Sequence, residues 1–160
     1  MLSPMALARA RLSTVERIVR PSGFYRQKAR HIRGLAKHVV EKYEGDIAGM
    51  RDRPMSELRE ELLEIPGIGP ETADSILLYA LDKPSFVVDA YTYRLLDRLG
   101  MRIGEDYDDV KTTFEKALGR RVEALADMHA LIVMHCKRVC TKVSRCGECC
   151  VSERCPSKRE

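Results

Sequence analysis

The chain has 160 residues and no tryptophan, and aromatic residues make up only 6% of it. A hydrophobic core must therefore be built mainly from aliphatic and methionine side chains. No apolar run approaches the roughly 18 residues that a membrane-spanning helix needs, so we expect no membrane association. The 28 basic and 24 acidic residues leave a net charge of +4, which permits a nucleic-acid partner without requiring one.

Strand periodicity is also missing, because no segment alternates apolar and polar residues over a useful length. Apolar residues recur instead at the spacing of amphipathic helices, separated by turns that contain Gly or Pro. This pattern predicts an all-α protein, as one compact domain or two small lobes, with helices near residues 7–19, 32–40, 56–64, 73–81, 90–99, 109–118 and 122–139. The first segment is rich in Arg and superficially similar to a transit peptide, but its apolar stripe favours an ordinary helix.

Cysteine is absent from the first 135 residues, and all six cysteines follow them. Four have the spacing of a ligand set, namely Cys140, Cys146, Cys149 and Cys155. Zinc sites usually use two closely spaced pairs, whereas this segment has one, so a 4Fe–4S cluster is favoured over zinc and either metal over disulfides. The other two, Cys136 and Cys150, are interpreted as a buried apolar residue and a bystander.

A glycine turn, "EIPGIGPETADSILL" (residues 64–78), lies between two predicted helices. Gly67 and Gly69 permit close backbone approach, and Pro70 suits the first position of a helix. The turn can hold a DNA phosphate through its backbone amides, or it can simply join two helices tightly. Glu71 adds a negative charge that favours the helix dipole but does not suit phosphate binding.

Asp89 lies between the apolar segment "PSFVV" and the predicted helix "AYTYRLLDRL". One interpretation is an N-cap, whose side-chain oxygen accepts hydrogen bonds from free backbone amides. The other is a functional carboxylate that stabilises a cationic sugar or orients a water molecule. The two roles are compatible.

These pieces together resemble the helix–hairpin–helix (HhH-GPD) DNA glycosylase superfamily, in particular its endonuclease III branch with an iron–sulfur loop. The resemblance is carried by "GFYRQKAR", "LLEIPGIGPETADSILLYAL", "FVVDAYTYRLLDRLG" and "HCKRVCTKVSRCGECCVSERC". It implies a helical domain over residues 1–135, with the helix–hairpin–helix motif near 57–81, and an iron–sulfur loop over residues 136–160. Family members begin with several further helices, so we expect the chain to be incomplete at its N-terminus.

The resemblance also implies roles for single residues. Asp89 matches the catalytic aspartate, and the four spaced cysteines match the ligands of the 4Fe–4S cluster. The expected DNA contacts are the hairpin residues Gly67, Ile68 and Gly69, together with Phe24, Tyr91 and Lys28. Phe24 matches a residue wedged into the duplex when a base is flipped out, although it could equally anchor the start of a helix. The basic residues near the cysteines would meet phosphates, or else form a solvated basic face (Lys137, Arg138, Lys142 and Arg145).

The sequence departs from the family at Glu71, where members with lyase activity have a lysine that forms a Schiff base. Because glutamate cannot form an imine, we expect a monofunctional glycosylase acting on a weakened base. The surrounding residues are similar to the branch that removes alkylated purines such as 3-methyladenine. The alternatives are an endonuclease III-like enzyme that uses another lysine, and a catalytically silent iron–sulfur module that binds DNA.

The resemblance implies double-stranded DNA with a damaged base as the partner of this chain. It further implies a monomer located in the cytoplasm, associated with the nucleoid if the source is a prokaryote.

Overall fold

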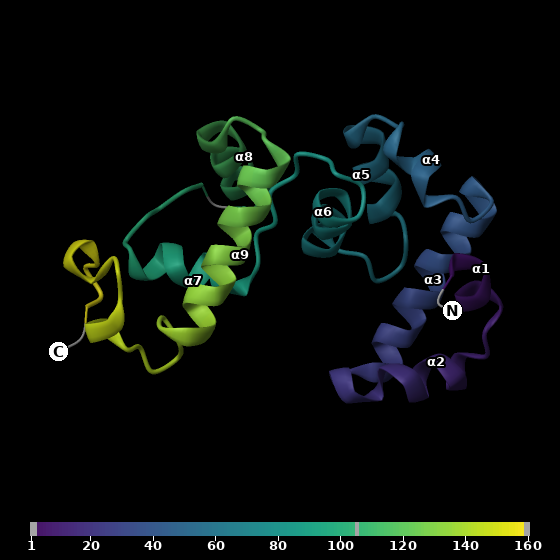
Figure 1. Cartoon of the computed structure of the whole chain (residues 1–160), viewed down its shortest axis with the longest axis horizontal. Coiled ribbons are helices and arrows are strands. Elements are labelled where there is room, and N and C mark those ends of the chain that lie inside the picture. The colour runs from purple at the N-terminus through teal and green to yellow at the C-terminus, as the bar shows by residue number, and fades with distance from the viewer. Residues whose placement is uncertain (1–2, 105, 159–160) are drawn as a thin grey trace. The chain divides into compact units, whose positions relative to one another are not determined.

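The computed structural model describes residues 3–104 and 106–158, and this part of the chain contains helices and no strand (Figure 1). The all-α prediction is confirmed. The chain divides into two compact units, of which the first ends at Ala73 and the second begins at Asp74. The predicted division at residues 135 and 136, which sets the cysteine loop apart, stays a prediction.

The first unit is built around a long helix, α3 (Tyr25–Tyr43), against which α1, α2 and α4 pack. Its other elements are α1 (Pro4–Arg9), α2 (Leu12–Val19), a short 3₁₀ turn (Arg20–Ser22), α4 (Ile47–Arg51), α5 (Met55–Leu63) and the first residues of α6 (Pro70–Tyr79). Buried side chains along α3 are Ala29, Ala36 and Val39, which lie at helical spacing.

Two details of this unit differ from the sequence-based expectation. The N-terminal segment forms two helices, because Ala10 and Arg11 both have extended backbone and interrupt the apolar stripe. The helix α4 was not predicted, since its five residues are too few to show a periodicity. Its start is fixed locally by Asp46, whose side chain accepts a hydrogen bond from the Ala48 amide.

A buried carboxylate joins α3 to α5. Glu61 is 6% exposed and contacts three side chains of α3: Nε2 of His38 at 2.6 Å, the ammonium of Lys42, and the hydroxyl of Tyr43 at 2.9 Å. Burial alone would raise the pKa of Glu61, but these three hydrogen bonds outweigh it and leave the pKa below its ordinary value. Burial and the nearby Glu61 raise the pKa of Tyr43 to about 12. The network therefore holds the two helices together through an ionised acid.

The described part of the second unit contains the rest of α6 and three further α-helices. These are α7 (Ala90–Arg98), α8 (Tyr107–Leu118) and α9 (Val122–Arg138), followed by two single-turn 3₁₀ helices (Cys146–Glu148 and Ser152–Arg154). Both α7 and α8 pack against α9. None of the helices in the described ranges is long and apolar enough to cross a membrane.

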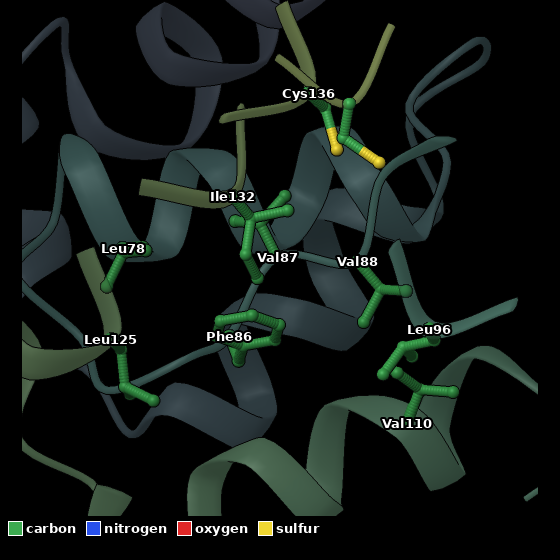
Figure 2. Packing of buried hydrophobic residues seen from close by; sticks show 10 residues of the cluster. Leu78, Phe86, Val87, Val88, Leu96, Val110, Leu125, Ile132 and Cys136 are labelled. Atoms are coloured by element: carbon green, nitrogen blue, oxygen red, sulfur yellow. The ribbon is translucent and has the colours of Figure 1, made fainter. Parts of the chain in front are cut away.

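The core of the second unit gathers around an extended segment that leads into α7 (Figure 2). Phe86, Val87 and Val88 in this segment are buried, and Phe86 stacks on Phe114 of α8 with ring centroids 4.2 Å apart. The neighbouring helices add the buried side chains of Leu78, Leu96, Val110, Leu125, Ile132 and Cys136, and Cys140 adds its own from just after α9. Burial of this segment fixes the position of the residue that follows it, Asp89.

Replacement of the buried acid tests the role of the α3–α5 network. We expect Glu61→Gln to lower the free energy of unfolding at pH 7 by about 1–3 kcal/mol, because a charged hydrogen-bond partner is lost from a buried site. Since the folded-state pKa of Glu61 is lowered, its contribution is present above the unfolded pKa of about 4.3 and is lost as pH falls through the folded value. Urea unfolding at pH 7 and pH 3 measures both effects.

The matched control is Glu57→Gln. Glu57 lies in α5 like Glu61, but it is exposed and pairs with Arg53, which precedes the helix. The substitution should change stability little, because an exposed ion pair contributes little. Equal behaviour of the two variants at pH 7 would contradict the role assigned to Glu61.

Candidate active site and cysteine site

The hairpin between α5 and α6 presents free backbone amides at the start of α6. The N–H groups of Gly67 and Gly69 donate no hydrogen bond within the part of the chain that the structure describes. The Ile68 N–H instead donates to the Ile65 carbonyl at 3.0 Å, and the Ile68 side chain is buried. A side chain added at Gly69 would meet open space. The hairpin therefore offers the amides of its two glycines to an anion, while Ile68 anchors the turn.

Gly67 is required by its surroundings as well as by its backbone. Its φ of +89° lies in the region that favours glycine. A Cβ at this position would lie 2.0 Å from Nε2 of His31, a side chain of α3. The imidazole of His31 therefore rests directly on the hairpin, a contact that the sequence did not suggest.

Glu71 is the second residue of α6, directly after Pro70, and is exposed. Its carboxylate lies in the first turn, where it interacts favourably with the positive end of the helix dipole. The structure thus places it at the start of the helix that follows the hairpin, in the first unit.

Phe24 stands out at the start of α3. It is 85% exposed and has left-handed backbone (φ 47°), which is unusual for a bulky residue. Lys28, one turn further along, donates to the Ser22 carbonyl at 2.6 Å and holds the preceding turn. The anchor interpretation of Phe24 is wrong, because its side chain is not buried. Its role as a wedge stays a prediction.

Asp89 caps α7 with one of its two oxygens. Oδ1 accepts from the Thr92 amide at 2.8 Å and from the Thr92 hydroxyl at 3.0 Å. The Asp89 amide in turn donates to the Thr92 hydroxyl oxygen at 3.5 Å. This reciprocal pair is a capping box. The N-cap interpretation of Asp89 is therefore confirmed, and the residue is 9% exposed.

The second oxygen of Asp89 faces a histidine that the sequence analysis missed. Oδ2 lies 3.6 Å from Nε2 of His129 on α9, and Nδ1 of this ring lies 2.7 Å from the hydroxyl of Tyr79 on α6. Burial alone would raise the pKa of Asp89, but the interactions with His129 and Thr92 outweigh it and leave the pKa below its ordinary value. The site therefore holds an ionised carboxylate in a largely buried setting.

Tyr91 is the second residue of α7, and two cations lie near its ring. The guanidinium of Arg94 is 5.0 Å from the ring centroid, and the ammonium of Lys137 is 5.8 Å from it. The ring also packs on the core of the second unit. Its expected contact with DNA stays a prediction, and the two cations beside it are suited to phosphates.

The four predicted ligand cysteines line one small cavity in the C-terminal loop. Cys140, Cys146, Cys149 and Cys155 all border it, and no disulfide joins them. Arg98, near the end of α7, donates to the sulfur of Cys140 at 3.1 Å and to the Thr141 carbonyl at 2.8 Å. Cys136 is buried beside Cys140 in the core but does not border this cavity, and burial, together with the neighbouring Cys140, raises the pKa of its thiol to about 11.

The arrangement of these cysteines can be compared with the two metal hypotheses. Among the described residues, no three His, Cys, Asp or Glu side chains converge on a point that could hold a metal ion. The four thiols that border one cavity form an all-cysteine donor set. Such a set can hold a 4Fe–4S cluster and can also hold zinc.

Most of the expected site residues fall into separate groups. The first unit contains the hairpin glycines, Glu71, Phe24 and Lys28, and the second contains Asp89, Tyr91 and the cysteines. Sequence analysis missed the residues that contact these groups from other helices. The available signal for His129 was its position in the mostly apolar stretch "HALIVMHC", in which His135 is the other titratable imidazole.

A family model described as HhH-GPD superfamily base excision DNA repair protein matches residues 1–120. A protein of Methanocaldococcus jannaschii, named as a DNA repair glycosylase, is 49% identical over 148 residues, which cover 90% of this chain and 66% of that protein. Endonuclease III of Thermotoga maritima is 29% identical over 154 residues, covering 96% of this chain and 68% of that protein. The chain thus spans about two thirds of the length of these curated relatives.

Two solved structures have the same fold. An endonuclease III in a non-covalent complex with DNA matches with a TM-score of 0.78 and 26% identity, covering 99% of this chain and 70% of that chain. The 3-methyladenine DNA glycosylase of H. pylori, bound to 1,N6-ethenoadenine, matches with a TM-score of 0.74 and 34% identity, covering 84% of this chain and 67% of that chain.

The two hairpin glycines give a direct test of the contact with His31. We expect Gly67→Ala to lower the free energy of unfolding by about 2–4 kcal/mol, because it combines backbone strain with overpacking against the imidazole. Gly69→Ala is the control and should be close to wild type in stability, because its methyl group meets open space. Chemical denaturation measures both, and equal losses would contradict the described packing.

Proposed function

Because the chain belongs to the HhH-GPD superfamily of base excision DNA repair proteins, we propose that it is a monofunctional DNA N-glycosylase. Its substrate is a damaged base, flipped out of duplex DNA and weakened by alkylation. The observation that carries the proposal is Asp89, a buried carboxylate kept ionised, with one oxygen committed to the cap of α7 and the other directed away from it.

The proposed reaction is hydrolysis of the bond between the base nitrogen and C1′ of the sugar. The base leaves with the bonding electrons, and C1′ and the ring oxygen share the positive charge that develops. The negative charge of Asp89 stabilises this cation, since electrostatic stabilisation is strong in a buried site. A water molecule then adds its oxygen to C1′ and gives up a proton to Asp89 or to solvent.

An alkylated purine suits this site. Such a base carries a positive charge before the bond breaks and leaves as a neutral molecule, so little general-acid help is required. The similarity to a 3-methyladenine DNA glycosylase, at 34% identity over 84% of the chain, supports this choice of substrate class.

Glu71 supports hydrolysis without strand cleavage. The lyase reaction needs an amine that attacks C1′ and forms an imine, and a carboxylate cannot do so. Relatives named endonuclease III favour the alternative in which another lysine performs the reaction. The two possibilities differ in whether a covalent adduct with DNA can be trapped.

The remaining features support DNA binding. The amides of Gly67 and Gly69 would receive a backbone phosphate at the start of α6. Phe24 would fill the gap beside the flipped nucleotide, which offsets part of the unstacking cost. A 4Fe–4S cluster, held by the four cysteines around the common cavity, would fix the fold of the C-terminal loop and its basic residues.

Base release tests the catalytic role of Asp89. We expect the wild-type chain to release the damaged base from a methylated duplex that contains 3-methyladenine. Asp89→Asn should reduce the single-turnover rate by a factor of about 100 or more, because it removes the charge that stabilises the cation. Product analysis by chromatography measures the rate, and binding to an abasic-site duplex serves as the control for folding. Absence of base release from the wild-type chain would favour a silent DNA-binding module.

Position 71 tests the monofunctional assignment. Borohydride should trap no covalent adduct between the wild-type chain and an abasic-site duplex. Glu71→Lys supplies the missing amine and should yield a trapped adduct visible on a denaturing gel, whereas Glu71→Gln should yield none. A wild-type adduct that depends on another lysine would establish the lyase alternative.

The cysteine assignment is tested by metal analysis. We expect the purified chain to contain iron and sulfide and to absorb visible light, and Cys146→Ser to lose both. Cys150→Ser is the matched control, because this neighbouring thiol does not border the common cavity, and it should retain the cluster. A colourless wild-type protein that contains zinc would contradict the assignment.

A further inference from the structure

The two carboxylate oxygens of Asp89 have different surroundings. Oδ1 accepts two hydrogen bonds from Thr92 and is committed to the start of α7. Oδ2 has no partner within hydrogen-bond distance in the described part of the chain, and the group that approaches it is His129 at 3.6 Å. Oδ2 is therefore the oxygen available for chemistry.

His129 itself has an unsatisfied atom directed at this oxygen. Its Nε2 is buried and has no hydrogen-bond partner among the described residues. A buried polar atom without a partner is costly, so such an atom at a candidate active site calls for an explanation. The distance to Oδ2 is slightly too long for a hydrogen bond, and a small shift, of the kind that accompanies substrate binding, closes it.

Tyr79 determines which nitrogen of the ring carries the proton. Its hydroxyl lies 2.7 Å from Nδ1 and 3.5 Å from the Ala126 carbonyl, so the short contact with Nδ1 is the better hydrogen bond for its single proton. A hydroxyl that donates to Nδ1 leaves the proton of a neutral imidazole on Nε2, facing Asp89. The opposite tautomer would turn the Nε2 lone pair towards a carboxylate, which is repulsive. Tyr79 is 51% exposed, so the chain of contacts runs from the surface to the buried acid.

We propose that His129, oriented by Tyr79, is a positioning residue that fixes the free oxygen Oδ2 of Asp89 at the reacting carbon. This inference rests on the proposed glycosylase function. The three side chains come from α6, the N-cap of α7 and α9, so the core of the second unit determines their geometry. His129 stabilises the carboxylate by donating to it and does not touch the substrate.

Other titratable groups near this chain of contacts do not replace His129. The charge of Asp127 affects Tyr79, whose pKa is raised by burial and by the charges of Asp89 and Asp127. As a carboxylate, Asp127 cannot donate a hydrogen bond to Oδ2 of Asp89. The Cys136 thiol donates to the Tyr91 carbonyl at 3.5 Å. His129 is therefore the one donor, among the described side chains, that faces Oδ2.

The first test measures Asp89 in the intact chain and does not depend on activity. Carbon-13 NMR follows the carboxyl titration of Asp89 in the wild type and in His129→Leu, His129→Gln and Tyr79→Phe. We expect the Leu variant to raise the midpoint by about one pH unit, the Gln variant to restore much of the wild-type value through its amide donor, and the Phe variant to have a smaller effect. Tyr93→Phe, at an exposed tyrosine on α7, is the control. An unchanged Asp89 midpoint in His129→Leu would overturn the proposal.

The second test uses single-turnover base release as a function of pH. His129→Leu should lower the maximal rate about 10- to 100-fold, shift the acid limb of the profile to higher pH, and leave duplex affinity nearly unchanged. If His129 had only a structural role, His129→Leu would lower stability and leave the acid limb of the pH profile unshifted. That result would overturn the proposal. If the wild-type chain releases no base while the NMR shift is found, the glycosylase assignment fails and the positioning of Asp89 stands.

Discussion

A carboxylate that is buried away from water stays ionised only if hydrogen-bond donors or positive charges stabilise it. In the second unit, Asp89 is such a carboxylate. Desolvation would favour the protonated acid, yet the pKa of Asp89 is lowered because Thr92 and His129 compensate the charge. The same residue begins α7, and the buried segment before it forms the centre of the core. The start of this helix, the packing around Phe86 and the candidate chemistry are therefore linked at one residue.

Other buried acids in the chain show what makes Asp89 different. Both oxygens of Glu61 have partners, His38 on one and Lys42 with Tyr43 on the other. Glu115 accepts from the Phe86 amide and from Lys111 on one oxygen, and Arg120 lies 3.8 Å from the other. Glu61 and Glu115 each connect elements of the fold through hydrogen bonds. Asp89 and Glu115 both keep one oxygen without a hydrogen bond in the described structure. That oxygen of Glu115 lies near the exposed guanidinium of Arg120, whereas that of Asp89 faces the buried Nε2 of His129.

Sequence reasoning succeeded where local patterns are sufficient. Helical spacing predicted all the longer helices, and the resemblance to one superfamily is confirmed by a family model that covers residues 1–120, which include the hairpin and Asp89. Helical spacing did not predict α4, which is too short for a periodic signal. Sequence reasoning also missed His31 and His129, which are 36 and 40 residues away in sequence from the Gly67 and Asp89 that they contact. Such contacts depend on how helices pack, and a single sequence contains no direct record of packing.

Phe24 has a consequence for the evolution of stability in this chain. Its left-handed backbone costs about 1–2 kcal/mol for a residue with a side chain, and with 85% of the residue exposed it gains almost nothing from burial. Selection for thermal resistance alone would replace it with glycine or asparagine, which adopt this conformation easily. Under the proposed function, in which Phe24 enters the duplex, a more durable protein and one able to distort DNA require different amino acids at this position.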